Sequence, residues 1–502
     1  MTIWRNVSVG IGSSAWTAVI GLAAVPVYLR YLGVEAYGLV GFFLALQAMF
    51  QLLDLGLAPT ISREVARCQA RSILPEARDL LLTFSVFYWA VAVVIAIGTT
   101  LAASWIGNDW LHPERVSRAD TIEAVVLMGL IIAIRFPIGL YTGVIQGAQR
   151  LAEASMLGAA VSTIGVVGGV ALLAFVSPTI RIFFVWQIVL AIAHLVAVRW
   201  GAWHLLGGKM LARFDWNGLR RIGRFAAAMS IVSVLGVLLS QLDKLILSRE
   251  VSLADLGRYT LAGIPARSLG LLTLPVFSVV YSRLSALVAV DDLNGIRDTY
   301  RKGTRLFLSL LLPVSVFMGL YSHDLIYAWT GNEPLARQVA TPATLLIFGS
   351  ALNSIMIFPF SLQLAFGNSR LPAMITLMLI AGFVPLLLWL IDTFGMVGAA
   401  AAWLALNATY VPLGTWLTHR SMLTDSRRAW LLKDVGLPLF VSIAVIGIGS
   451  LAAEWLSSPL WRLAVGVGLL PCAFALIVAV SPSMLPAGVA TKFFKKTFRK
   501  NH

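Results

Sequence analysis

Charged residues are scarce in this sequence, and cysteine is nearly absent. Of the 502 residues, 12% are charged and 59% are hydrophobic, and the mean hydropathy is +0.86. Soluble domains carry about twice that charged fraction, so a soluble globular protein is excluded. Cys68 lies in a basic segment and Cys472 in an apolar run. They are expected at different depths, which excludes a structural disulfide between them.

Motifs for phosphate loops, metal sites and hydrolytic centres are also missing. Gly207-Gly208-Lys209-Met210 lacks the glycine spacing and the hydroxyl group of a nucleotide-binding loop. The sequence contains no His-Glu-x-x-His, no Gly-x-Ser-x-Gly and no Cys/His cluster with metal spacing. We therefore predict a protein that is not an enzyme and that has neither a cofactor nor a metal site.

Long apolar runs recur from one end of the chain to the other. A run of 18 or more apolar residues is long enough to cross a membrane as a helix. The predicted spans are 8–29, 37–59, 80–106, 122–145, 155–176, 182–206, 225–248, 257–281, 306–329, 340–364, 373–392, 398–419, 435–456 and 461–480. The sequence thus predicts an all-α polytopic membrane protein with about 14 transmembrane helices. The first span only weakly resembles a cleaved signal and is expected to be retained.

The basic residues sit in short segments between these runs. Lys and Arg accumulate in cytoplasmic loops, and with the N-terminus inside, most of the 38 basic residues fall on the cytoplasmic side. Both termini are therefore predicted to be cytoplasmic. The net charge of +15 forms no single basic face, so nucleic acid is not expected as a partner. The basic and aromatic tail 492–500 fits a stop-transfer anchor or an anionic lipid surface.

The two halves of the chain share a short repeat at an offset of 219 residues. Tyr28-Leu29-Arg30 and then Gly38, after a loop with Glu35, align with Leu247-Ser248-Arg249 and then Gly257, after a loop with Asp255. Six spans separate the copies, so the halves have the same orientation and are related by an axis along the membrane normal. We predict two six-helix lobes that enclose a central cavity. The predicted parts are 1–206 (N-lobe), 207–224 (cytoplasmic linker), 225–419 (C-lobe) and 420–502 (two further helices and the tail).

Arg135 is the clearest ionisable residue at mid-membrane depth. An ionisable residue there costs a few kcal/mol and needs a partner or a water-filled cavity. Gly139, Gly143 and Gly147 follow on the same helix face at intervals of four, so that face can admit a close neighbour. We favour an Arg135 that lines a cavity. The alternative is a packing seam of small residues in which a carboxylate elsewhere neutralises the arginine.

Polar side chains form a stripe along the second span. Gln47, Gln51 and Asp54 are spaced by four and three residues and therefore share one face, which a lipid-facing helix would not keep. Asp54 is interpreted either as a proton site or as the ion-pair partner of Arg135 or Arg267.

The seventh and eighth spans carry further charges. Arg267 lies between Pro265 and Pro275, where a bend is expected. This arginine either lines a wetted cavity or pairs with Asp243. Asp243 and Lys244 are adjacent, and because helical neighbours point about 100° apart, we expect that they do not face one another and that at least one faces the cavity. Snorkelling to the outer interface is the alternative for Lys244.

Three more spans carry isolated polar residues. His194 and Gln187 are seven residues apart on the sixth span and share a face. A hydrogen-bonded structural role for His194 is favoured over a proton relay. Asn353 and Asn407, in the tenth and twelfth spans, are predicted to hydrogen-bond between helices.

The segment 28–38, Tyr-Leu-Arg-Tyr-Leu-Gly-Val-Glu-Ala-Tyr-Gly, followed by Asp54-Leu55-Gly56-Leu57 and Arg63-Glu64, resembles the start of bacterial polysaccharide flippases. These are exporters of lipid-linked O-antigen or exopolysaccharide repeat units, within the multidrug/oligosaccharidyl-lipid/polysaccharide superfamily. Gln241-Leu242-Asp243-Lys244 and Leu256-Gly257-Arg258-Tyr259 resemble the opening of that family's second half. The span count, topology and repeat offset agree over essentially the whole chain.

This resemblance implies a V of two six-helix lobes plus two extra helices in the bacterial inner membrane. The implied substrate is an undecaprenyl-diphosphate-linked oligosaccharide, which is moved from the cytoplasmic to the outer leaflet for O-antigen or exopolysaccharide synthesis. Arg135, Arg267 and, as a further candidate, Lys244 would be the cavity cations, with Asp54 as their acidic counterpart. Polysaccharide polymerase and assembly proteins are implied as partners, beside the lipid bilayer.

Three alternatives stay open. A lipid II flippase would present the same headgroup chemistry. A multidrug or cation antiporter of the same superfamily would need an acidic cavity, whereas the deep acids are only Asp54 and Asp243. A membrane polysaccharide polymerase or ligase is the alternative among enzymes.

Overall fold

The computed structural model describes residues 3–208, 212–215, 234–423 and 427–481, and these residues are helical apart from short connections. Eleven helical stretches among them are long and apolar enough to cross a membrane, which confirms the predicted all-α membrane fold. Two of these stretches, Ser8–Asp54 and Arg370–Met422, each contain two predicted spans. The span predicted at 225–248 and the linker 207–224 lie partly outside the described residues, and the basic tail 492–500 lies wholly outside them.

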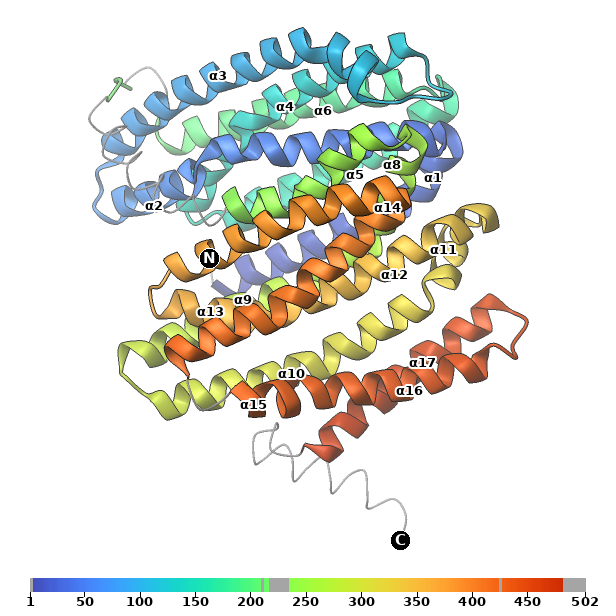
Figure 1. The fold of residues 1–502 in the computed structure, drawn as a ribbon. Coiled ribbons are helices and arrows are strands. Elements are labelled where there is room, and N and C mark those ends of the chain that lie inside the picture. Colours follow the sequence, from blue (N-terminus) through green and yellow to red (C-terminus); the bar gives the residue numbers. More distant parts are fainter. Residues whose placement is uncertain (1–2, 209–211, 216–233, 424–426, 482–502) are drawn as a thin grey trace. The chain divides into compact units, whose positions relative to one another are not determined.

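The chain divides after Gly257 into two compact units. The first unit contains α1 (Ile3–Gln51), η1 (Leu52–Asp54), α2 (Leu57–Ala70), α3 (Leu74–Trp105), η2 (Ile106–Trp110), α4 (Arg118–Gly147), α5 (Leu151–Phe175), α6 (Ile180–Leu205) and a helix at 234–250. In this unit α4 packs between α3 and α6, and α1 packs along α5 (Figure 1). Helix α8 (Leu253–Ser268) crosses the division. The boundaries predicted for the N-lobe, the linker, the C-lobe and the C-terminal part stay a prediction.

The second unit contains the remaining helices: α9 (Gly270–Ala289), α10 (Leu293–Leu320), α11 (Ser322–Thr330), α12 (Glu333–Ile355), α13 (Ile357–Ala365), α14 (Arg370–Met422), α15 (Arg427–Ala429), η3 (Trp430–Gly436), α16 (Leu437–Ala453) and α17 (Pro459–Val480). Helix α12 packs on α14, and α10 packs on the pair α16–α17. The Asn353 amide donates to Asn407 Oδ1 at 2.9 Å, which confirms the interhelical hydrogen bond predicted between these residues.

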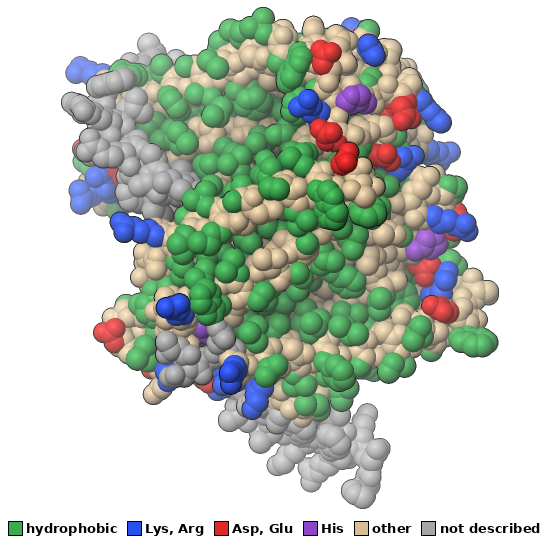
Figure 2. All heavy atoms as spheres, viewed as in Figure 1, with side chains coloured by type: hydrophobic (Ala, Val, Ile, Leu, Met, Phe, Trp, Pro, Cys, Tyr) green, Lys and Arg blue, Asp and Glu red, His purple; other side chains and the backbone are tan. Residues whose placement is uncertain are grey.

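The surface has the composition expected of helices in lipid. Large apolar side chains such as Leu101, Phe175 and Ile448 are well over half exposed. On the face shown in Figure 2, hydrophobic side chains cover the middle of the helices, and charged side chains gather toward the helix ends. An exposed apolar middle with charged ends is the pattern of membrane-spanning helices.

Helices α1 and α14 each bend back on themselves at one glycine. Gly33 has φ 80° and ψ 168°, and Gly395 has φ 56° and ψ −132°. Positive φ is readily adopted only by glycine, so these residues allow two helical arms to meet in a V (Figure 1). Past the second turn, a β-carbon on Gly398 would lie 1.8 Å from the carbonyl oxygen of Leu390. Each predicted pair of spans is thus joined by a tight turn.

The repeat predicted at an offset of 219 residues appears as a reciprocal contact within the first unit. A β-carbon on Gly38 would lie 2.1 Å from the carbonyl oxygen of Leu253, and one on Gly257 would lie 2.1 Å from that of Val34. Gly38 aligns with Gly257, and Val34 aligns with Leu253. The same contact is therefore made twice with the roles exchanged, as a two-fold relation between the repeats requires.

Glu35 fixes the connection between η2 and α4. The Glu35 side chain is buried and accepts backbone hydrogen bonds from Glu114 at 2.6 Å, Arg115 at 2.9 Å and Val116 at 3.2 Å. A carboxylate that accepts from successive backbone N–H groups is a strong, charge-assisted anchor. Glu35, the acidic residue in the first copy of the repeat, therefore serves to hold this connection in place.

Replacing Glu35 with glutamine is expected to lower the free energy of unfolding by about 1.5–3 kcal/mol. A neutral amide loses the charge that strengthens these bonds, and its NH₂ group would face backbone donors. Denaturant unfolding of the purified protein measures the change. The control is Glu114→Gln in the same connection, because the Glu114 side chain is exposed and should shift stability by less than about 0.5 kcal/mol. Equal effects of the two substitutions would contradict the anchor.

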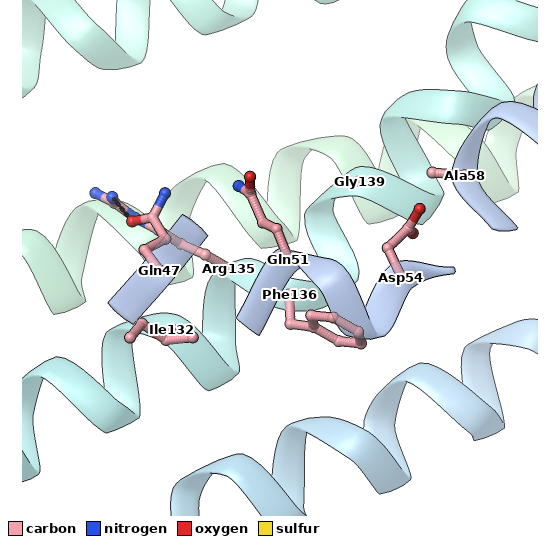
Figure 3. Close-up of a pocket in the computed structure, with 8 residues that line it drawn as sticks. All are labelled: Gln47, Gln51, Asp54, Ala58, Ile132, Arg135, Phe136 and Gly139. Atoms are coloured by element: carbon pink, nitrogen blue, oxygen red, sulfur yellow. Dashed lines mark hydrogen bonds between the residues drawn. The ribbon is translucent and has the colours of Figure 1, made fainter. Parts of the chain in front are cut away.

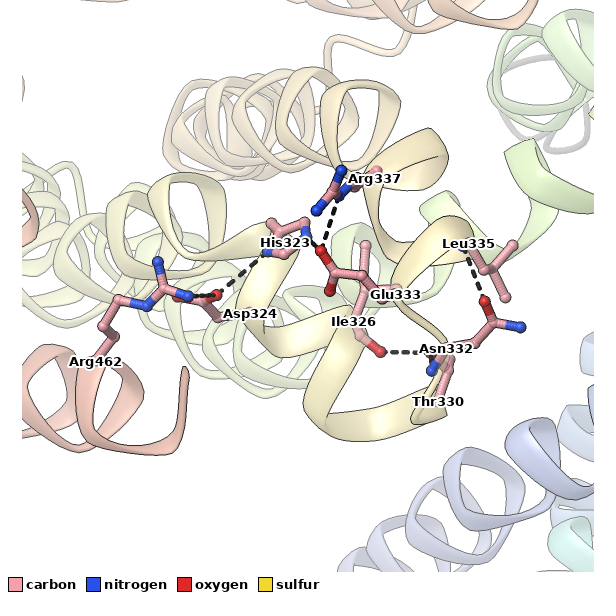
Figure 4. Close-up of polar contacts among 9 residues, drawn as sticks. All are labelled: His323, Asp324, Ile326, Thr330, Asn332, Glu333, Leu335, Arg337 and Arg462. Atoms are coloured by element: carbon pink, nitrogen blue, oxygen red, sulfur yellow. Dashed lines mark hydrogen bonds and ion pairs between the residues drawn. The ribbon is translucent and has the colours of Figure 1, made fainter. Parts of the chain in front are cut away.

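Polar contacts hold the last two helices at both ends. Toward the start of α16, Asp434 on η3 accepts from Arg301 Nε at 2.7 Å and Arg305 Nε at 2.9 Å, both on α10. At the other end, Arg462 on α17 pairs with Asp324 on α11 at 2.9 Å (Figure 4). Lipid supplies no hydrophobic drive between helices, so such polar contacts specify where the α16–α17 pair docks.

Candidate functional site

A cavity of about 290 Å³ opens in the first unit between α1 and α4. Its polar lining comes from the predicted stripe Gln47, Gln51 and Asp54 together with Arg135. Figure 3 shows the stripe on the end of α1 and on η1, with Arg135 on α4 beside Gln47. The sequence-predicted polar stripe and the predicted deep arginine are therefore brought together. Ala58, Ile132, Phe136 and Gly139 complete the lining.

Two amide oxygens hold the guanidinium group of Arg135. Its Nη1 donates to Gln47 Oε1 at 3.0 Å, and its Nη2 donates to Gln187 Oε1 at 2.7 Å. The guanidinium carbon also lies 5.6 Å from the centre of the Phe43 ring. Within the described part of the chain, no carboxylate forms an ion pair with Arg135. The amides orient the group and leave its positive charge uncompensated, which differs from the alternative of an arginine neutralised by a carboxylate.

Asp54 is held by another set of groups. Its carboxylate accepts a hydrogen bond from the Tyr88 hydroxyl on α3 and from the backbone of Gly56 and Ala58 at the start of α2. The predicted ion pair with Arg135 is not formed in this structure. The reason is local: Leu55 and Gly56 adopt left-handed backbone between η1 and α2, which turns the carboxylate toward the first amides of α2.

The glycines that follow Arg135 form a packing seam, as expected for a face without side chains. A β-carbon on Gly143 would lie 2.7 Å from the carbonyl oxygen of Ala58, and one on Gly147 would lie 2.3 Å from that of Ser62. Helix α2 therefore packs directly on the backbone of α4. Only Gly139 lines the cavity, so this face of α4 serves partly as a cavity wall and partly as a seam.

The prediction that Asp243 and Lys244 do not face one another is wrong. Lys244 Nζ lies 2.9 Å from Asp243 Oδ1 and also donates to the carbonyl oxygen of Ser240 at 2.9 Å. The angle between neighbouring Cβ directions does not decide the contact, because the four-carbon stem of lysine can fold back over one turn. Pairing is strongly favoured where water is scarce. Asp243 is buried and Lys244 is largely so, and this pairing compensates the charge of Lys244.

The remaining predicted residues do not line this cavity. Arg267 is exposed on α8 in the second unit, and the described residues provide it with no ion pair. Helix α8 ends at Ser268 and α9 begins at Gly270, so the helix is interrupted in the stretch that is predicted to bend. His194 is half-buried on α6 and close enough to Arg135 for an electrostatic interaction.

Three contributors to the site were not predicted as such: Gln187, Tyr88 and Phe43. The seven-residue spacing of Gln187 and His194 indicated a shared polar face on α6, but not that Gln187 would bind Arg135. Tyr88 and Phe43 lie in apolar runs and carry no local signal. Their roles depend on how the helices pack.

The sequence matches a known family over residues 3–288, that of the polysaccharide biosynthesis proteins. A relative in Shigella flexneri, named "Putative O-antigen transporter", is 21% identical over 410 residues, which cover 80% of this chain and 94% of the relative.

The fold is similar to solved transporter structures. A lipid II flippase, MurJ, in an inward closed conformation aligns with a TM-score of 0.71 at 13% identity, covering 95% of this chain and 98% of MurJ. An inward-facing multidrug transporter of the MATE family and MOP superfamily aligns with a TM-score of 0.67 at 13% identity, covering 81% of this chain and 94% of that one. At this identity the likeness shows the shared fold alone.

Proposed function

Because this chain belongs to the family of polysaccharide biosynthesis proteins, we propose that it is a flippase for undecaprenyl-diphosphate-linked oligosaccharide repeat units. It carries them from the cytoplasmic to the periplasmic leaflet of the bacterial inner membrane, for O-antigen or exopolysaccharide synthesis. It acts as a transporter and not as an enzyme, next to the polymerase and assembly proteins that use the exported units. The name of the Shigella flexneri relative supports this assignment.

The observation that carries the proposal is the uncompensated charge of Arg135. A guanidinium group has five N–H donors in a fixed plane, and the two amide oxygens of Gln47 and Gln187 bind one donor on each terminal nitrogen. In the described part of the chain no other side chain hydrogen-bonds to the remaining donors, and in our proposal they bind a ligand in the cavity. Phosphate oxygens match this geometry and the charge of arginine, so a diphosphate would bind here.

The size of the cavity indicates which part of the substrate it would hold. At about 290 Å³ it lies at the lower limit of small-molecule pockets. It therefore suits the diphosphate headgroup. In our proposal the sugars occupy further space that opens during transport, and the polyprenyl tail stays in lipid.

Alternating access would complete the cycle. We propose that the headgroup enters from the cytoplasmic side, that Arg135 compensates its charge in this cavity, and that the repeats then open outward. A role of Arg267 in substrate binding stays a prediction. Moving an anion outward is favoured by the membrane potential by about 2.3 kcal/mol per charge for each 100 mV. A separate chemical energy source is not required by this scheme.

Replacing Arg135 with alanine is expected to reduce transport at least tenfold at normal protein levels. A charge-assisted hydrogen bond contributes about 1.5–3 kcal/mol, which corresponds to roughly 10- to 150-fold. The measurement is the leaflet distribution of undecaprenyl-diphosphate oligosaccharide in inverted vesicles, read with an impermeant glycosidase. Arg181→Ala is the matched control, since Arg181 is exposed and pairs with Glu123 on the surface.

Four outcomes would contradict the proposal. Full transport by the Arg135→Ala variant would show that the anion does not bind here. Selective transport of lipid II would identify a lipid II flippase, and efflux of organic cations would identify an antiporter. Formation of a new glycosidic product in detergent would instead indicate an assembly enzyme.

A further inference from the structure

A second cavity, of about 810 Å³, lies in the second unit where α10, η3 and α17 meet. Its lining includes five basic residues, which are Arg297, Arg301, Lys302, Arg305 and Lys433, and one acidic residue, Asp298, which pairs with Lys302. It shares no residue with the cavity around Arg135. This concentration of positive charge does not take part in the proposed transport path.

Two of the five basic residues are fixed in place by a buried acid. Asp434 is fully buried and accepts hydrogen bonds from both Arg301 and Arg305, one turn apart on α10. One carboxylate thus holds two guanidinium groups side by side, leaving a net positive charge at the cavity. Arg301 remains about one-third exposed, so part of its planar group faces the opening.

The other end of η3 is also immobilised. Trp430 is fully buried and donates from Nε1 to Thr304 Oγ1 on α10 at 3.0 Å. Its ring stacks on that of Tyr300 with 5.7 Å between the centres. The π-helical turn is therefore docked on α10 before any ligand is present, and the basic residues are positioned in advance, which reduces the entropic cost of binding.

From the ends of the neighbouring helices we infer that the cavity lies at the depth of lipid headgroups. Helix α16 begins at Leu437 and α17 ends at Val480, and both residues line the cavity. They form an apolar wall beside the charged one. The distribution of basic residues predicts that this side faces the cytoplasm.

We propose that this cavity binds the phosphate group of an anionic glycerophospholipid from the cytoplasmic leaflet. Arginine and lysine donors contact the phosphate oxygens, and Leu437 and Val480 contact the start of the acyl chains. Residues 482–502 contain no Asp or Glu, so charge complementarity does not favour the chain's own tail as the ligand. Bound lipid would seal the α16–α17 pair against α10.

The test compares lipid binding by two variants that lose the same charge. Arg297 and Lys433 are exposed lining residues, and the Arg297→Gln/Lys433→Gln variant keeps the buried ion pairs of Asp434. Arg283→Gln/Arg370→Gln is the matched control, since both arginines are exposed in the same unit and neither lines the cavity. Native mass spectrometry of the full chain in detergent measures binding of phosphatidylglycerol, phosphatidylcholine and inorganic phosphate.

We expect the Kd for phosphatidylglycerol to rise at least about tenfold in the Arg297→Gln/Lys433→Gln variant and less than about twofold in the control. If the double variant loses folded protein, Lys433→Gln alone is expected to give a smaller rise of the same kind. Equal affinity in both variants, or equal binding of phosphatidylcholine, would overturn the proposal. Displacement of phosphatidylglycerol by millimolar inorganic phosphate would show a site for soluble phosphate and would also overturn it.

Discussion

Replacing Gly38 with leucine is expected to reduce transport to the background of vesicles that lack the protein. The β-carbon alone would lie 2.1 Å from the Leu253 carbonyl oxygen, well inside van der Waals contact. The obstacle is backbone, so no change of rotamer relieves it, and the helices must separate by about 1 Å or more. In our proposal this contact, on the predicted outer side, closes and opens once in each transport cycle.

A second measurement reports the separation directly. The reporter is Leu253→Cys in a background that carries Cys68→Ser and Cys472→Ser, because Leu253 is buried in the structure. We expect this cysteine to react at least tenfold faster with an impermeant maleimide once Gly38 is replaced. Gly38→Ala and Gly257→Ala are expected to have similar effects, because the two glycines make the same contact in the two repeats.

Gly21→Leu is the control for helix propensity and side-chain size. Apart from the backbone of its own helix, no heavy atom would lie within 4 Å of a β-carbon at Gly21. This change should therefore leave transport within about twofold of the parent. Unchanged transport and labelling in the Gly38 variants would mean that the reciprocal contact does not open during the cycle.

The Asp434→Asn variant is expected to lose about 3–5 kcal/mol of unfolding free energy. Removal of one partner from a buried ion pair leaves uncompensated charge, and here two guanidinium groups would face each other without the carboxylate between them. Arg305 is the more buried of the two arginines, with its side chain about one-tenth exposed. Denaturant unfolding of the purified protein, followed by tryptophan fluorescence, measures the loss.

Asp298→Asn provides the comparison on the same helix. Asp298 pairs with Lys302 at 2.7 Å, but both side chains are more than half exposed. Solvent screens such a pair, so its removal should cost less than about 1 kcal/mol. A loss of similar size in both variants would show that burial does not determine the strength of the Asp434 cluster.

The sequence was sufficient to predict four polar side chains that line the cavity, Gln47, Gln51, Asp54 and Arg135, but not how they would bond. The spacing of Gln47, Gln51 and Asp54 determines a face, and their polarity keeps that face away from lipid. The same penalty places Arg135 inside the bundle. Those two constraints bring the four residues together without knowledge of helix packing.

Specific partners depend on the register between helices, which local periodicity does not contain. Gln187 binds Arg135, and Tyr88 binds Asp54, because α6 and α3 lie at particular heights against α4 and α1. The error at Lys244 has another origin. Helical geometry fixes the direction of the Cβ atom but not the end of a long flexible side chain, and in a dry environment the ammonium group reaches the nearest carboxylate.

The sharp turns at Gly33 and Gly395 have a consequence for biogenesis. In α1 and α14 the polypeptide reverses at one non-helical residue, so no long connector separates the first arm from the second. We expect each V to enter the bilayer as a helical hairpin, and an epitope placed between Leu32 and Val34 to block insertion of both arms together.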